Sequence, residues 1–79
     1  MDFNADKVDE TVLALLWLTV HDENELGGAR AWKGHDWDAL DRLHTKGYIG
    51  DPQSKAKSVV LSPEGLAKSR ELFRMMFGT

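Results

Sequence analysis

Two signals that mark helix ends constrain the C-terminal half of this chain more than any other feature. Gly47 supplies the positive φ with which helices commonly end, and Ser62-Pro63 places a capping hydroxyl before a proline that fits a first helical turn. Two short β-prone runs lie between them, Tyr48-Ile49 and Ser58 to Leu61, separated by a polar stretch. We therefore predict a two-stranded β-hairpin between a helix that ends near Lys46 and a helix that begins at Pro63.

One long apolar helix dominates the N-terminal half. Asn4 and Asp6 are both suited to cap its start, and apolar residues cover about half of its girth up to Val20. The expected elements are a helix from near Asp6 to near His21, a loop over 22–28, one helical turn at most over 29–34, a helix over 37–46, the hairpin, and a helix over 63–77. They predict one domain over residues 1–79, of the α+β class and mostly helical, with three helices and a two-stranded β-hairpin between the second and the third.

The first helix is apolar over a wider face than one small domain covers, so we expect it to be central and also to join a subunit interface. Leu13, Trp17 and Val20 form a second stripe on it, and Met75 and Met76 add flexible apolar area near the C-terminus. We predict that these five residues contact a second copy or another protein. Four further aromatic residues are predicted to lie mostly in the core: Trp32, Trp37, Phe73 and Phe77.

The net charge of −3 is divided unevenly along the chain. Residues 1–27 hold seven acids and one base, whereas residues 28–79 hold six acids and nine bases. Six of these bases are candidate nucleic-acid contacts: Arg42 and Lys46 on the second helix, Lys55 and Lys57 on the hairpin loop, and Arg30 and Lys33 before them. Asp38 and Asp41 on the same second helix would repel phosphates, so DNA is the less favoured partner.

Several other classes of protein are not expected. There is no cysteine and no basic, apolar leader, which favours the cytoplasm, and the run from Val12 to Val20 is far shorter than the roughly 20 residues of a bilayer span. His21, His35 and His44 match no zinc spacing, and no nucleophile motif or phosphate-binding loop is present. We predict no metal, no cofactor and no enzymatic activity.

The segments Lys46-Gly47-Tyr48-Ile49 and Leu61-Ser62-Pro63-Glu64-Gly65, with the helix before them and the polar loop between them, resemble winged helix-turn-helix regulators of the MarR and PadR kinds. This resemblance spans about half of the chain and implies a truncated winged-helix-like domain, with the helix over 37–46 as recognition helix and the hairpin as wing. The whole chain is also similar to a family of short, uncharacterised bacterial proteins that share AWKGHDWD, LDRLH and KGYI followed by KAKSVVL and EG. That similarity implies a bacterial origin and no particular activity.

Taken together, these features favour a winged-helix-like interaction or regulatory module that works as a homodimer, with a protein as its partner. The alternative is a transcriptional regulator that contacts DNA through the helix over 37–46 and the wing.

Overall fold

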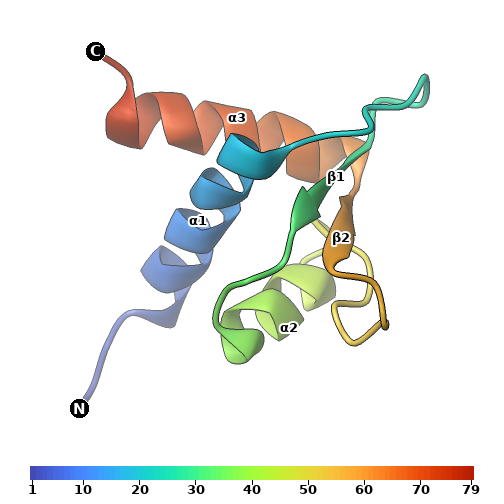
Figure 1. The fold of residues 1–79 in the computed structure, drawn as a ribbon. Helices are drawn as coiled ribbons and strands as arrows, with labels where there is room; N and C mark the ends of the chain where they lie inside the picture. The colour runs from blue at the N-terminus through green and yellow to red at the C-terminus, as the bar shows by residue number, and fades with distance from the viewer.

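Six secondary-structure elements make up the computed structural model, which describes residues 1–79 (Figure 1). In chain order they are α1 (Ala5–Leu16), the short 3₁₀ helix η1 (Trp17–Thr19), β1 (Ala29–Trp32), α2 (Trp37–Thr45), β2 (Ser58–Leu61) and α3 (Pro63–Phe77). The fold is α+β and mostly helical, with three α-helices and a two-stranded antiparallel sheet, as predicted. None of the helices combines the length and the apolar character needed to cross a membrane.

Each α-helix begins at a side chain that accepts a hydrogen bond from the first turn. The capping side chains are those of Asn4, Asp36 and Ser62, and each lies 3.0–3.1 Å from a backbone nitrogen three residues further along. Asp6, the other candidate cap, lies inside the first turn of α1. Gly47 follows α2 with a φ of 83°, so the helix stop predicted there is confirmed.

β1 lies within residues 29–34, for which we predicted at most one helical turn, and that prediction is wrong. Ala29 and Ala31 are buried, whereas Arg30 is half-buried and Trp32 is exposed, which is the two-residue alternation of a strand. The local helix propensity of alanine and arginine is outweighed here by pairing with β2 and by burial of the two alanines.

β2 lies between β1 and a single residue that follows α2. Leu61 is opposite Ala29 in the antiparallel β1–β2 register, and on its other side it forms an isolated bridge with Ile49. The strand predicted over residues 48–49 is thus reduced to this one bridge. The two-stranded sheet is confirmed, but its first strand precedes α2 in the chain, so α2 and a loop separate the two strands.

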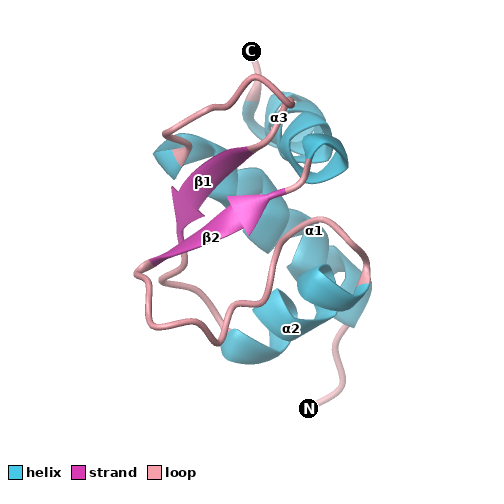
Figure 2. Ribbon diagram, turned by 90° about the vertical axis from the view of Figure 1, so that its right-hand side faces the viewer, coloured by secondary structure: helices cyan, strands magenta, loops and turns pink.

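α1 is the central helix, and its leucines form the core with those of the other elements. The side chains of Leu13, Leu16, Leu40, Leu43 and Leu61 are all 1% exposed or less. In Figure 2 the sheet lies in front of the helices, so no helix covers the face of the sheet that is turned to the viewer. The core therefore lies on one side of the sheet only.

α3 is fixed by two close approaches to other segments. Its start lies against Tyr48, because the Ser62 amide donates to the Tyr48 carbonyl oxygen at 3.0 Å, and a Cβ added at Gly65 would overlap that carbonyl group. Further along, the buried Ser69 hydroxyl donates to the Leu13 carbonyl oxygen of α1 at 2.6 Å. Glycine at position 65 thus permits a backbone contact that no other residue allows.

Candidate partner interface

Arg42 and Lys46, two of the six candidate nucleic-acid contacts, are held by a buried carboxylate of α1. Asp9 is 1% exposed, and its oxygens lie 2.9 Å from Arg42 Nε and 2.9 Å from Lys46 Nζ. Lys46 Nζ also lies 3.2 Å from the Asp6 carboxylate. These contacts join α1 to α2, and a phosphate that bound either base would have to compete with Asp9.

The electrostatics of this cluster keep all three groups charged at neutral pH. Burial by itself would raise the pKa of Asp9, but hydrogen bonds and charge from Arg42 and Lys46 outweigh burial and lower that pKa below 3.8. Hydrogen bonding to Asp9 in turn raises the pKa of Arg42 and the pKa of Lys46. The cluster is therefore an internal ion-pair network that links two helices.

Three candidate lysines on or beside the loop between α2 and β2 differ in their availability. Lys33 Nζ donates to the carbonyl oxygens of Pro52 and Ser54 at 2.7 Å and 2.6 Å, so this lysine holds the loop in place. Lys55 and Lys57 are exposed, and neither forms an ion pair. Of the six candidate bases, only these two are both exposed and free of ion pairs.

The uncovered face of the sheet carries an aromatic and a basic side chain. Trp32 is 52% exposed, and its ring centroid lies 4.6 Å from that of His21. Arg30 precedes it on the same face and donates from Nε to Ser58 Oγ at 2.8 Å. Trp32 was predicted to lie in the core, and that prediction is wrong because the core lies on the other face of the sheet.

Two other aromatic residues depart from the predicted core positions in the same way. Trp37 is 53% exposed and Phe77 is 49% exposed, whereas Phe73 packs against the core. The ring of Trp37 lies under the Lys33 ammonium, at 5.6 Å. Trp37 begins α2 and Phe77 ends α3, and a helix terminus projects beyond the elements that would cover its side chains.

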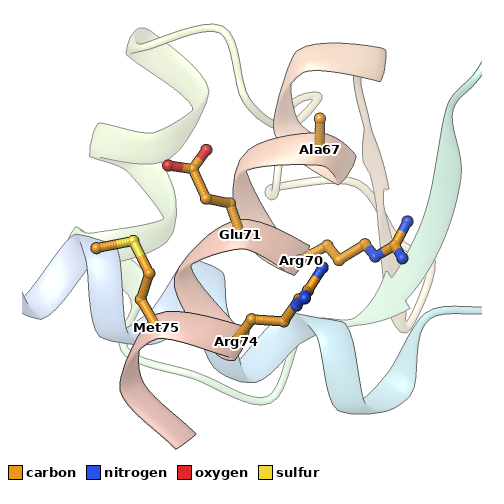
Figure 3. A pocket seen from close by; sticks show the side chains of 5 residues that line it. All are labelled: Ala67, Arg70, Glu71, Arg74 and Met75. Carbon is orange, nitrogen blue, oxygen red and sulfur yellow. The ribbon is translucent and has the colours of Figure 1, made fainter. Parts of the chain in front are cut away.

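The outer side of α3 forms an open hollow, which we call the α3 groove (Figure 3). Its lining residues are Ala67, Arg70, Glu71, Arg74 and Met75. Arg70 and Arg74 extend toward one side of the helix, and Glu71 extends toward the other, where its carboxylate lies 3.9 Å from Lys68 Nζ. The groove thus presents two guanidinium groups beside a small residue and an exposed methionine.

A second hollow joins the α3 groove to the loop over residues 22–27, which we call the acidic loop because it holds three acids and no base. Glu23 and Gly27 of this loop line the second hollow, together with Ala67 and Arg70 of the groove. Asn24 Oδ1 accepts hydrogen bonds from two backbone amides of this turn, at 2.9 Å and 3.2 Å. The acidic loop therefore has a defined shape next to the N-terminal half of α3.

The five predicted interface residues fall into two groups. Leu13 is 1% exposed and belongs to the core, so the structure removes it from any surface, and Val20 packs partly buried against the core. Trp17 lines the second hollow, and Met75, which is 73% exposed, lines the α3 groove. Met76 is 40% exposed near the end of α3.

The arginines of the α3 groove were not among the predicted site residues. Their signal in the sequence is the spacing of Ala67, Arg70 and Arg74, at three and four residues, which places them on one helical stripe. Glu23 has no such signal, because only the tertiary structure brings it near Arg70. No three His, Asp or Glu side chains are placed together in a way that could hold a metal ion.

Comparison with known proteins gives a family and one curated relative. The family described as "Domain of unknown function (DUF6429)" matches residues 4–79. The chain is 54% identical over 77 residues to the uncharacterized protein y4hR of Sinorhizobium fredii, and the match covers 98% of this chain and 97% of that protein. No solved structure matches the chain, so the resemblance to winged-helix regulators stays a prediction, whereas the similarity to a short, uncharacterised bacterial family is confirmed.

Proposed function

The chain belongs to the family of domains of unknown function DUF6429, and we propose that it is a binding module that forms a homodimer through the α3 groove and the acidic loop. The proposal keeps Trp17 and Met75 from the predicted interface. It moves the contact from α1 to α3, because the rest of the fold covers most of the apolar face of α1 and its Leu13 lies in the core.

One observation carries this proposal: the surface formed by the acidic loop and the α3 groove bears opposite charges at its two ends. The acidic loop lies beside Pro63, at the start of α3, and Arg70 and Arg74 follow along the helix. A two-fold axis through the middle of this surface places the acids of each copy over the arginines of the other. The surface is therefore complementary to itself.

The shape of α3 suits such a pairing. Its 15 residues extend for about 22 Å, and two such helices packed antiparallel bring each helix start near the other's end. Ala67 permits close approach near the middle. Leu26, which is 87% exposed in the acidic loop, and Met75 are apolar side chains that the second copy covers.

The connectivity supports a winged-helix-like architecture for the module. β2 lies between β1 and Ile49, and a polar loop that holds Lys55 and Lys57 joins α2 to β2, in the position of a wing. A DNA-binding role through α2 has less support, because Arg42 and Lys46 both pair with Asp9. The absence of cysteine favours the cytoplasm as its compartment.

Light scattering coupled to size exclusion tests the dimer with two charge-reversed variants. The first combines Arg70→Glu with Arg74→Glu, and the second combines Glu23→Lys with Glu25→Lys. We expect the wild type at twice the monomer mass and each variant alone as a monomer, because like charges then face each other. An equal mixture of the two variants returns to the dimer mass, because every loop in the mixed dimer faces a groove of opposite charge.

The matched control combines Lys55→Glu with Lys57→Glu on the loop between α2 and β2. It changes the net charge by as much as the double arginine variant does, and we expect it to stay dimeric. A wild type that is monomeric at its highest soluble concentration contradicts the proposal. So does a mixture of the two variants that remains monomeric.

A further inference from the structure

We propose that the uncovered face of the sheet binds single-stranded nucleic acid, with Trp32 as the surface on which a base stacks and with Arg30, Lys55 and Lys57 as the contacts to phosphate. This site is separate from the α3 groove, so the proposal does not rest on the dimer. It also differs from duplex recognition by α2, which the Asp9 ion pairs oppose.

The indole ring of Trp32 is exposed on the sheet and held in place. A tryptophan that is 52% exposed on a strand is not needed to fill the core. Its backbone is fixed, because the Trp32 amide donates to Thr19 Oγ1 at 3.0 Å and the strand pairs with Ser58 in β2. One side of the ring lies against His21, at 4.6 Å between centroids. The structure thus presents an ordered aromatic ring, of the kind on which unpaired bases stack.

The guanidinium of Arg30 lies beside that ring. Arg30 lies two residues before Trp32 on the same face, opposite Val60 in the register, and Val60 is 44% exposed. The hydrogen bond from Arg30 Nε to Ser58 Oγ is the side chain's only hydrogen bond, so the guanidinium is oriented while its terminal N–H groups remain available. These N–H groups can donate hydrogen bonds to the phosphate that follows the stacked base in the nucleic acid.

The two strands and the segments next to them are basic. Residues 29–35 and 52–61, which contain both strands and the segments next to them, hold four bases and no acid, in a chain whose net charge is −3. Two acids flank these segments, and each is oriented by its own turn: Asp36 accepts from the Ala39 amide at 3.1 Å, and Asp51 accepts from the Gln53 amide at 2.9 Å. A polyanion is therefore the complementary ligand for this face.

An exposed aromatic ring favours a single strand over a duplex. Bases in a duplex are already stacked on each other, so an exposed indole ring gains a stacking partner only from an unpaired base. Asp22 borders the site, with its carboxylate 3.9 Å from His21 Nε2, and this limits how closely a second phosphate approaches on that side. The ligand therefore runs from the ring toward Arg30 and the loop lysines.

Fluorescence polarisation on the full chain at about 50 mM salt tests the site, with labelled oligo(dT), labelled oligo(U), the corresponding dA·dT duplex and oligoglutamate as probes. We expect both single strands to bind, more tightly than the duplex, and to quench tryptophan fluorescence. Trp32→Ala weakens binding about tenfold, which corresponds to the loss of one stacked base, and Trp32→Phe keeps most of the affinity. Lys55→Glu combined with Lys57→Glu weakens binding and reduces its salt dependence.

Trp37→Ala is the matched control, because Trp37 is 53% exposed but lies on α2 and not on the sheet. We expect Arg70→Glu combined with Arg74→Glu to keep the preference for single strands over the duplex, because the site is separate from the α3 groove. The proposal is overturned if neither single strand binds, if the duplex binds as tightly, or if Trp37→Ala weakens binding as much as Trp32→Ala. Equal affinity for oligoglutamate also overturns it, since the face would then be a docking site for acidic proteins.

Discussion

Replacing Gly65 by alanine reverses the usual effect of this substitution in a helix. Alanine ordinarily stabilises a helix relative to glycine, by up to about 1 kcal/mol. At this position a Cβ would lie 2.7 Å from the Tyr48 carbonyl carbon, whereas ordinary contact begins at 3.4 Å. The Tyr48 carbonyl oxygen lies closer still to this Cβ, so the start of α3 must move away from Tyr48 by more than about 0.7 Å, the difference between the two distances.

The cost of that movement exceeds the gain in helix propensity. Overpacking of this kind costs about 1–3 kcal/mol. Ser62 donates to the Tyr48 carbonyl oxygen from its amide at 3.0 Å and from its hydroxyl at 3.3 Å. Each of these hydrogen bonds that is lost costs about 1 kcal/mol more. We expect Gly65→Ala to lower the free energy of unfolding by about 2 kcal/mol, and Tm by roughly 8–16 °C for a domain of this size.

Thermal and urea unfolding, followed by far-UV circular dichroism, measure this change. Gly34→Ala is the matched control, because a Cβ at Gly34 meets no atom within 4 Å and its φ is not in the left-handed region. We expect this control to be neutral or more stable by about 0.4–1 kcal/mol, through a reduced entropy of the unfolded chain. A Gly65→Ala protein as stable as the wild type, or more stable, refutes the argument from the Tyr48 contact.

Two further predictions concern contacts that join α1 to its neighbours. Burial raises the pKa of Asp9, but Arg42 and Lys46 outweigh burial, so the pKa of Asp9 in the folded state lies below the usual 3.8. The ionised Asp9 therefore stabilises the fold above pH 3.8, and this stabilisation is lost as the pH falls through the folded-state pKa. Urea unfolding at a series of pH values will show a shallower loss of stability in acid for Asp9→Asn than for the wild type, and equal slopes contradict this. Ser69→Ala removes the buried hydrogen bond to the Leu13 carbonyl oxygen and will lower the free energy of unfolding by about 1 kcal/mol. An unchanged urea midpoint for Ser69→Ala would mean that this bond contributes nothing net.

The elements predicted correctly from the sequence are those whose signals lie within a few residues of each other. Asn4, Asp36 and Ser62 cap helices because each side chain needs only an amide three residues away. Gly47 ends α2 because its own backbone adopts a positive φ. β2 was found because its β-prone run is bounded by turn residues and by the cap of α3.

Only some of the residues predicted for a partner interface lie at the surface, for a reason that concerns the first helix. Periodicity identified a wide apolar face on α1 but could not say whether other elements of the same chain cover it. The structure buries Leu13 under the other helices and leaves Trp17 and Met75 beside hollows. The α3 groove was missed because Arg70 and Arg74 have the spacing of an ordinary solvated helix face.

The sequence by itself determined where the three α-helices begin and where α2 ends, since capping and a glycine stop are local chemistry. It did not determine the end of α1, which lies at Leu16 and not near His21, with η1 following it. Only the tertiary structure decided that residues 29–32 form a strand, because Ala29 and Ala31 have strand geometry through pairing with β2, about thirty residues further along the chain. The same holds for charge: Asp9 lies 33 residues from Arg42 and 37 from Lys46, and no local pattern links them. Burial and pairing between distant segments are properties of the packed chain, so they settled which bases are engaged inside the protein and which aromatic residue remains exposed on the sheet.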